Sequence, residues 1–276
     1  MPRLARVLIL LPPSEGKATP RRGAPLDLDG LSFPELTFGR ERLLAALVEH
    51  CSDAPERAVA TLGLGATQSD LVARNAALLG APTARADRVY TGVLYDALGF
   101  DGLSPAARRR AATRVLITSS LFGVVRPTDR IPSYRLSGDV SLPGVGPVAG
   151  VWRGLLGAPV IEALGSGLLL DLRSTTYAAF WRPPAALAPR VATLRVLQEQ
   201  DGRRTVVSHF NKATKGRLVR DLLEDGTQPR TPGALADLIA GLGWQVELGP
   251  SGRTGTRIDV VVTEVSAAAA RRSAAR

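Results

Sequence analysis

Lysine is scarce in this chain of 276 residues and is confined to two short segments. Of the 35 basic residues only Lys17, Lys212 and Lys215 are lysines, and arginine supplies the rest. Lysine carries a compact ammonium whose pKa shifts readily on burial, whereas the guanidinium of arginine stays charged. Because the lysines stand in the two most motif-like segments, their placement favours a functional role over chance.

The first lysine closes the segment Leu11-Pro12-Pro13-Ser14-Glu15-Gly16-Lys17, which follows an apolar run. A strand, a tight loop and a Gly-Lys pair are typical of phosphate-binding loops. The full signature, however, requires Gly in place of Leu11 and Ser or Thr in place of Ala18. A nucleotide triphosphatase of that kind is therefore excluded. Ligands usually bind just past strand ends in open sheets, so Ser14 and Lys17 are candidate ligand contacts, with an ordinary polar loop as the alternative.

The other two lysines stand in the segment 208–217, where a predicted strand ends and a helix begins. Lys212, Lys215 and the helix N-terminus together make a corner that attracts anions. His209 titrates near neutrality and is a candidate proton shuttle, although a lone histidine can equally be structural.

Two arginines and one aspartate complete the set of candidate polar groups. Arg126 and Arg135 lie in the loop region after a predicted strand, where guanidinium groups can grip phosphate bidentately, unless Asp129 ties one of them down. Asp171 ends an apolar run, where a carboxylate costs energy unless it is paired, for example with Arg173, or functional. It is a candidate general acid or base. The candidate catalytic residues are Lys17, Arg126, Arg135, Asp171 and Lys212.

The segment 55–79 fits a helix–hairpin–helix pattern. Two short apolar helices are joined by Leu62-Gly63-Leu64-Gly65, and Thr67 follows. Two glycines permit a tight hairpin, and free backbone N–H groups after it can hold a DNA phosphate without reading sequence. The candidate DNA-binding residues are Gly63, Leu64, Gly65, Thr67, Lys17, Arg126, Arg135, Lys212 and Lys215. Leu62 replaces the usual proline, so a plain corner between two helices is the alternative.

Composition limits the other possibilities. The net charge of +10 favours a polyanionic partner such as DNA, although the Ala, Arg and Gly richness also fits a general compositional bias. One cysteine and two histidines exclude a disulfide framework and a zinc site of the usual kind. We expect no metal and no cofactor, with a metal site made of carboxylates alone as the alternative that composition leaves open. No apolar run approaches the ~20 residues of a membrane span, and the run at 7–11 is too short for a signal peptide. We therefore expect a cytoplasmic protein with no membrane partner.

Hydrophobic periodicity predicts an α/β (α+β) fold, namely a single domain over 1–264 with a mixed β-sheet, flanking helices and the inserted helix–hairpin–helix element at about 55–79. The last residues, 265–276, are predicted to form a disordered basic tail. Strands are predicted at 7–11, 114–118 and 168–172, with hairpins pairing 190–199 with 205–209 and 245–248 with 257–263. Helices are predicted at 40–50, 104–112 with Ser104 as N-cap, 151–164, 174–181, 212–223 and 232–242, besides the two within 55–79.

The order of several motifs resembles the YaaA family of peroxide-stress-resistance proteins. The motifs are 8–17, Tyr90-Thr91-Gly92, Leu121-Phe122-Gly123-Val124-Val125-Arg126-Pro127, Tyr134-Arg135-Leu136, 171–177 and 210–216. The resemblance covers about Val7 to Thr263, and its most specific part is the pairing of Phe-Gly-Val-Val-Arg-Pro with Tyr-Arg-Leu. The loop Pro-Pro-Ser-Glu-Gly-Lys and His209 depart from the pattern seen elsewhere in the family.

The resemblance implies a cytoplasmic bacterial protein that binds duplex or branched DNA and limits iron-driven damage under peroxide. It places the hairpin at Gly63, Leu64 and Gly65, and it implies a basic cleft lined by Lys17, Arg126, Arg135, Lys212 and Lys215. The alternative is an enzyme that acts on a phosphorylated, nucleotide or nucleobase substrate in the same cleft. The two interpretations are compatible if the substrate is DNA. A cavity beside Lys17 and Asp171 favours the enzyme, and a shallow basic groove favours binding alone.

Overall fold

The protein is built around an eight-stranded mixed sheet, as seen in a computed structural model that describes residues 6–200, 203–205 and 208–263. Side chains at positions 66, 208–210 and 263 are outside this description, as is the predicted tail at 265–276. The strand order is β11 (Gln245–Gly252), β12 (Gly255–Thr263), β9 (Val191–Gln200), β8 (Leu168–Asp171), β1 (Val7–Leu11), β3 (Val115–Ser119) and β4 (Gly123–Val125), and β10 (Arg203–Thr205) pairs with β9. The predicted α/β class with a mixed sheet is confirmed.

The centre of the sheet is parallel. Strand β1 runs parallel to β3 and β8, and β9 runs parallel to β8 and β12, whereas β4, β10 and β11 join antiparallel. Strands β1 and β3 are buried along their whole length, as the unbroken apolar runs of a covered parallel sheet require. The carboxyl ends of the parallel strands therefore share one edge, which is where loops with polar residues are expected to form a site.

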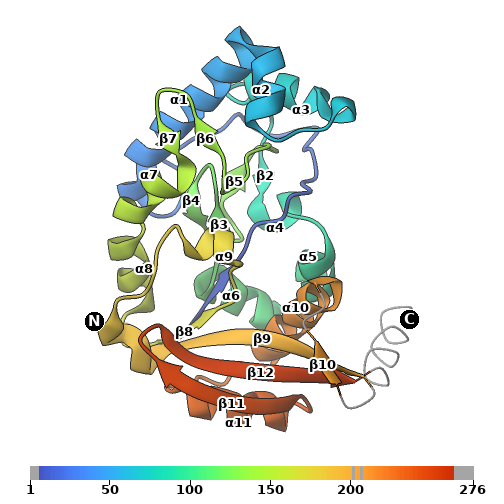
Figure 1. Ribbon diagram of the computed structural model, residues 1–276, viewed down its shortest axis with the longest axis vertical. Helices are drawn as coiled ribbons and strands as arrows, with labels where there is room; N and C mark the ends of the chain where they lie inside the picture. Colours follow the sequence, from blue (N-terminus) through green and yellow to red (C-terminus); the bar gives the residue numbers. More distant parts are fainter. Residues whose placement is uncertain (1–5, 201–202, 206–207, 264–276) are drawn as a thin grey trace.

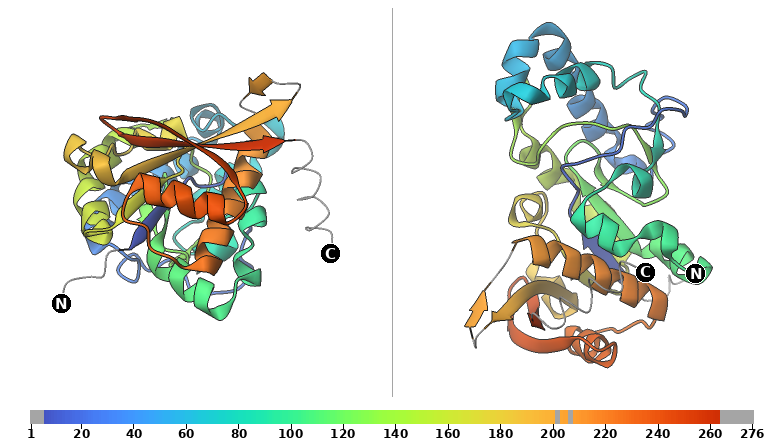
Figure 2. Two further views of the ribbon diagram at one scale, coloured as in Figure 1. Left: turned by 90° about the horizontal axis from the view of Figure 1, so that it is seen from below. Right: turned by 90° about the vertical axis from the view of Figure 1, so that its right-hand side faces the viewer.

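Helices surround the sheet and extend the molecule along its long axis (Figure 1). Helices α1 (Thr37–Asp53), α2 (Pro55–Thr61) and α3 (Asp70–Ala76) gather at one end, and α11 (Pro232–Gly241) lies beside β11 at the other. Helices α10 (Ser208–Asp225) and α11 lie on the same side of β9 and β12 (Figure 2). The remaining helices are α4 (Ala86–Val89), α5 (Val93–Leu98), α6 (Pro105–Arg114), α7 (Val148–Leu155), α8 (Gly157–Leu164) and α9 (Thr175–Ala178). No helix of the described chain is long and apolar enough to cross a membrane.

Two small two-stranded sheets complete the fold outside the main sheet. Strand β2 (Ala84–Arg85) pairs with β5 (Arg130–Ile131), and β6 (Ser141–Leu142) pairs with β7 (Gly146–Pro147). The fully buried guanidinium of Arg40 ties α1 to β4. It donates to the carbonyls of Ser32, Phe122 and Val124 at 2.7 to 3.1 Å, and burial lowers its pKa to about 10.

Most predicted elements are present with shifted ends, and three expectations were wrong. Residues 208 and 209 do not continue a strand, because β10 ends at Thr205 and α10 begins at Ser208. The helix predicted from Ser174 to Trp181 is only the single turn of α9, and Ser174 makes no side-chain cap. The helix predicted over 151–164 is two helices, since the chain breaks at Leu156. By contrast, Ser104 caps α6 as expected, accepting a hydrogen bond from the Ala107 N–H at 3.2 Å.

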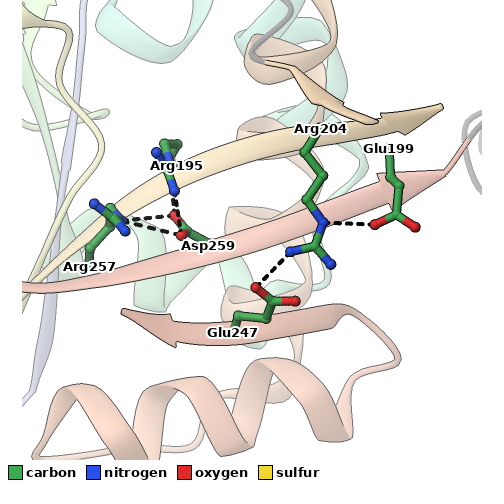
Figure 3. A network of polar contacts seen from close by, with 6 residues as sticks. All are labelled: Arg195, Glu199, Arg204, Glu247, Arg257 and Asp259. Carbon is green, nitrogen blue, oxygen red and sulfur yellow. Dashed lines mark hydrogen bonds and ion pairs between the residues drawn. The ribbon is translucent and has the colours of Figure 1, made fainter. Parts of the chain in front are cut away.

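Figure 3 shows three arginines on β9, β10 and β12, each paired with at least one carboxylate. Arg195 donates two hydrogen bonds to Asp259 at 2.7 and 2.8 Å, and Arg257 adds a third at 3.2 Å. Burial alone raises the pKa of Asp259, but these arginines hold it below its usual value. Arg204 likewise bridges Glu199 and Glu247 at 2.8 and 2.9 Å (Figure 3). This strongly charged surface is therefore internally neutralised.

Candidate functional site

The loop after β1 is fixed against the segment before α5. The Ser14 hydroxyl donates to the Gly16 carbonyl at 2.6 Å and accepts from the Thr91 N–H at 3.1 Å. The Ala18 N–H donates to the Val89 carbonyl at 2.8 Å, so Lys17 forms an isolated β-bridge with Tyr90. These bonds hold a loop of unusual sequence, with two consecutive prolines, in one conformation beside the strand end.

Lys17 is half-buried, and its ammonium is enclosed by aromatic rings. The amine Nζ donates to the Ser14 carbonyl at 2.8 Å and lies 4.3 Å from the ring centre of Tyr134 and 5.5 Å from that of Tyr90. Burial lowers the pKa of Lys17 to about 7, against an opposing effect of Glu15 and with a smaller contribution from the charge of Arg135. A substantial share of Lys17 is therefore a neutral amine near pH 7, which can accept a proton or act as a nucleophile.

All four tyrosines of the chain lie at this site. The hydroxyls of Tyr90 and Tyr134 are 3.0 Å apart, and the Ser119 hydroxyl at the end of β3 lies 2.8 Å from that of Tyr134. Tyr95 stacks on Tyr90 with ring centres 5.6 Å apart and donates to a backbone carbonyl of the first loop. Burial raises the pKa of Tyr90, Tyr95, Tyr134 and Tyr177, so these phenols remain neutral hydrogen-bonding groups.

A cavity of about 390 Å³ opens beside this cluster. It lies among the loop after β1, the start of α5, the turn α9 and the first part of α10, which meet in the middle of the molecule (Figure 1). Its walls are formed by Pro12, Pro13, Ser14, Glu15, Gly16, Thr91, Gly92, Val93, Leu94, Tyr95, Ser137, Ser174, Thr176, Tyr177 and Lys212. Lys17 stands directly behind the Ser14 wall, and exposed Lys212 stands in the wall itself. We call this space the strand-end cavity.

Three of the predicted cations, Lys17, Arg135 and Lys212, lie around the strand-end cavity. Arg135 forms an ion pair with Glu15, a wall residue, while Lys212 reaches the cavity from α10. One turn further along α10, Lys215 donates to the Leu172 carbonyl at 3.3 Å, and burial lowers its pKa. Lys215 thereby links α10 to the segment after β8 rather than to the cavity.

Asp171 and Arg126 occupy other positions. Asp171 receives two hydrogen bonds from the buried guanidinium of Arg173, at 2.6 and 2.9 Å, so its carboxylate is engaged in positioning the chain after β8. Arg126 donates to the Thr113 carbonyl at 3.0 Å, at the end of α6, and lies over the Phe33 ring. It is not among the residues of the cavity wall.

The hairpin residues lie apart from the strand-end cavity. Gly63 adopts a φ of 62°, which favours glycine, and Leu64 packs against the core. The Gly65 N–H is bonded to the Gln68 side chain at 3.1 Å, and Thr67 is exposed. A single-turn 3₁₀ helix at Ala66–Gln68 precedes α3. The segment 55–79 holds two acidic and two basic residues, so it contributes no net charge.

The sequence pointed to the lysines as candidate site residues. It did not predict that the tyrosines cluster, or that the rings of Tyr90 and Tyr134 enclose the Lys17 ammonium. The sequence offered one signal for this cluster. The chain has only four tyrosines, and three of them stand in the family motifs at 90–92, 134–136 and 171–177. The side chain of His209, the predicted proton shuttle, is outside the described residues.

Comparison with known proteins agrees with the motif order. The family described as "Peroxide stress protein YaaA" matches residues 7–247. A UPF0246 protein of Streptomyces coelicolor is 50% identical over 261 residues, which cover 94% of this chain and all of that protein. A UPF0246 protein of Corynebacterium efficiens is 43% identical over 244 residues, which are 88% of this chain and 95% of the relative. A protein of Campylobacter jejuni described as uncharacterised is 28% identical over 211 residues, 76% of this chain and 82% of its own length. On the family match and on these relatives, the chain belongs to the YaaA family of peroxide stress proteins.

Proposed function

We propose that this member of the peroxide stress family is a cytoplasmic enzyme that acts on a nucleotide unit of DNA in the strand-end cavity. The observation that carries the proposal is the enclosed amine of Lys17, which lies 2.8 Å from a carbonyl of the cavity wall. With its pKa lowered to about 7, this amine serves as a base or nucleophile without prior deprotonation. Such a group is of little use for steering phosphates, for which arginine suffices.

The surroundings of Lys17 fit a nucleotide better than a neutral substrate. Lys212 supplies a positive charge on the cavity wall, and Ser14, Thr91, Ser137 and Thr176 supply hydroxyls. Tyr95 and Tyr177 contribute aromatic surface to the same wall, against which a base can stack. A volume of about 390 Å³ is within the usual range for small-molecule sites. The reaction is therefore proposed to take place on one nucleotide held away from its neighbours.

DNA binding through the hairpin is the second candidate. The observation in its favour is the tight turn at Gly63, which leaves Thr67 exposed beside a short 3₁₀ turn. Because the segment has no net charge, contact with DNA would rely on backbone N–H groups. A Thr67→Glu variant tests this directly, with Gln245→Glu on the distant strand β11 as a control of the same charge change. We expect Thr67→Glu alone to weaken duplex binding several-fold, and equal affinities for the two variants would remove the hairpin from the proposal.

The experiment that tests the main proposal is fluorescence-anisotropy binding of duplex and four-way-junction DNA across a salt series. The wild type is compared with Lys17→Ala/Lys212→Ala and with Arg109→Ala/Arg230→Ala, which removes two exposed cations that line no described part of the cavity. We expect a steep loss of wild-type affinity with salt and a further loss, at least tenfold, only in the lysine variant. Binding that hardly depends on salt would contradict the proposal.

The proposed reaction on DNA is tested by a separate measurement. Peroxide-treated duplex DNA is incubated with each protein, and released bases and cleaved strands are measured by mass spectrometry. We expect product from the wild type and from Arg109→Ala/Arg230→Ala, and none from Lys17→Ala. DNA binding without any product from the wild type would reduce the proposal to a binding protein.

A further inference from the structure

A second cavity, of about 470 Å³, lies beside the segment that follows α9, and its lining includes two arginines. Its walls are Arg153 from the last turn of α7 and Ala179, Trp181 and Arg182 from the segment after α9. Both arginines are exposed. A guanidinium presents a planar fork of N–H donors that matches the oxygens of a phosphate. Two such groups around one cavity favour a phosphate as the ligand.

The two arginines differ from most others because they have no polar partner in the part of the chain that the structure describes. No hydrogen bond or ion pair joins Arg153 or Arg182 to any described residue, whereas Arg195, Arg204 and Arg257 are each held by carboxylates. An unpaired arginine keeps its donors available and loses no protein partner when an anion binds. The cavity is therefore positively charged and ready for a ligand, unlike the neutralised face in Figure 3.

The wall between the arginines is held rigidly. Trp181 is 6% exposed, and its backbone carbonyl accepts a hydrogen bond from Arg173 at 2.9 Å. The same guanidinium is bonded to Asp171 and lies 5.7 Å from the Trp181 ring centre. The ion pair at the end of β8 thus fixes the position from which Arg182 projects.

The walls of the two cavities include residues that are close together in the sequence. Thr176 and Tyr177 line the strand-end cavity, and Ala179, Trp181 and Arg182 line the second one. Arg182 follows Thr176 by six positions, so their Cα atoms are at most about 22 Å apart. A strand of a few nucleotides is long enough to reach from one set of residues to the other.

Building on the proposed function, we infer that Arg153 and Arg182 bind a backbone phosphate of the DNA strand whose reacting nucleotide lies in the strand-end cavity. The substrate is then a strand rather than a free mononucleotide. The nucleotide in the strand-end cavity is held by Lys212 and the wall hydroxyls, and a phosphate further along the same strand is held by the two arginines. Affinity for a strand should exceed affinity for a single nucleotide by the contribution of this second contact.

The test compares a fluorescein-labelled single-stranded 12-mer with the four deoxynucleoside monophosphates, which are measured by calorimetry. The proteins are the wild type, Arg153→Ala/Arg182→Ala and the charge-matched Arg109→Ala/Arg230→Ala. We expect the first variant to bind the 12-mer at least tenfold more weakly, with the slope of log K against log salt reduced by about 0.7, since the two arginines share one phosphate and each single-strand phosphate contact contributes about 0.7. Its affinity for monophosphates and its thermal unfolding should equal those of the control.

The outcomes separate this inference from the proposed function. If Arg153→Ala/Arg182→Ala leaves 12-mer affinity and salt slope unchanged while Lys17→Ala/Lys212→Ala abolishes monophosphate binding, the phosphate site is refuted and the strand-end site stands. If the arginine variant weakens 12-mers and monophosphates equally, the second cavity belongs to the nucleotide site, and the inference of a strand path is wrong. If the wild type binds neither probe, both proposals fail.

Discussion

The side-chain amide of Asn75 forms two hydrogen bonds with the backbone of Arg135, donating to its carbonyl at 2.7 Å and accepting from its N–H at 2.9 Å. Asn75 belongs to α3, the second helix of the predicted hairpin, and is fully buried. Arg135 in turn pairs with Glu15 in the wall of the strand-end cavity. The helical end of the molecule is thereby connected to the cavity through one asparagine.

This connection predicts that Asn75→Ala destabilises the protein. Both backbone groups of Arg135 would lose their partner in a buried place, at a cost of about 1–3 kcal/mol for each group left unsatisfied. Urea unfolding measures the change. The control is Gln68→Ala, which removes an exposed hydrogen bond to Gly65 in the same segment. Equal stability of the two variants would mean that water replaces the lost bonds.

Lys17 predicts a specific dependence of stability on pH. Its pKa is lowered from 10.5 to about 7, so between these values the folded state carries a neutral amine and the unfolded state a charged one. The unfolded state then binds more protons, and the free energy of unfolding rises with pH, by up to about 1.4 kcal/mol per unit. Below pH 7 the amine is charged in both states and this dependence disappears.

The measurement is urea unfolding of the wild type and of Lys17→Met at half-unit steps from pH 6 to pH 9.5. The methionine removes the ionisable group and keeps an unbranched side chain of similar length, so the difference between the proteins isolates Lys17. We expect the difference to change by about 1 kcal/mol per unit above pH 7.5. Parallel curves over the whole range would show that Lys17 has an ordinary pKa in the folded protein.

We predict that Asp171 stabilises the folded protein by pairing with the buried guanidinium of Arg173. An Asp171→Asn variant leaves the guanidinium of Arg173, a side chain that is 2% exposed, without its carboxylate. Breaking such a buried pair by removing one partner costs about 3–5 kcal/mol. The double variant Asp171→Asn/Arg173→Met should recover part of the loss, since no uncompensated charge remains. Thermal unfolding measures both, and a stable Asp171→Asn protein would return Asp171 to the candidates for direct chemistry.

The sequence predicted the strands that carry the site because these strands are short, unbroken apolar runs bounded by polar loops. The confinement of lysine to two segments also identified Lys17 and Lys212 as candidates at one site. The position of Arg126 was unpredictable from the sequence, since the direction of its side chain depends on where the end of α6 packs. The start of α10 was misplaced for a related reason. The run 205–209, which follows the turn signal Asp201-Gly202, predicts a return strand, whereas β10 ends at Thr205 and α10 begins at Ser208.

Gly216 provides the last prediction, because it sets the distance between α10 and α5. A Cβ atom at Gly216 would lie 2.2 Å from the Leu94 carbonyl oxygen and 2.9 Å from the Ala97 side chain. Gly216→Ala must therefore push α10, which carries Lys212, away from α5, which carries Leu94 and Tyr95. Both helices contribute walls to the strand-end cavity, so the variant should lose nucleotide affinity at least tenfold as well as stability.

Gly233→Ala in α11 is the matched control, because nothing lies within 4 Å of a Cβ atom at that position. In an exposed helix, alanine is favoured over glycine by up to about 1 kcal/mol, so the control should be as stable as the wild type or more so. Urea unfolding and calorimetry with deoxynucleoside monophosphates give both readouts. If Gly216→Ala loses stability but binds nucleotides normally at a temperature where it is folded, the spacing of α5 and α10 does not determine the geometry of the strand-end cavity.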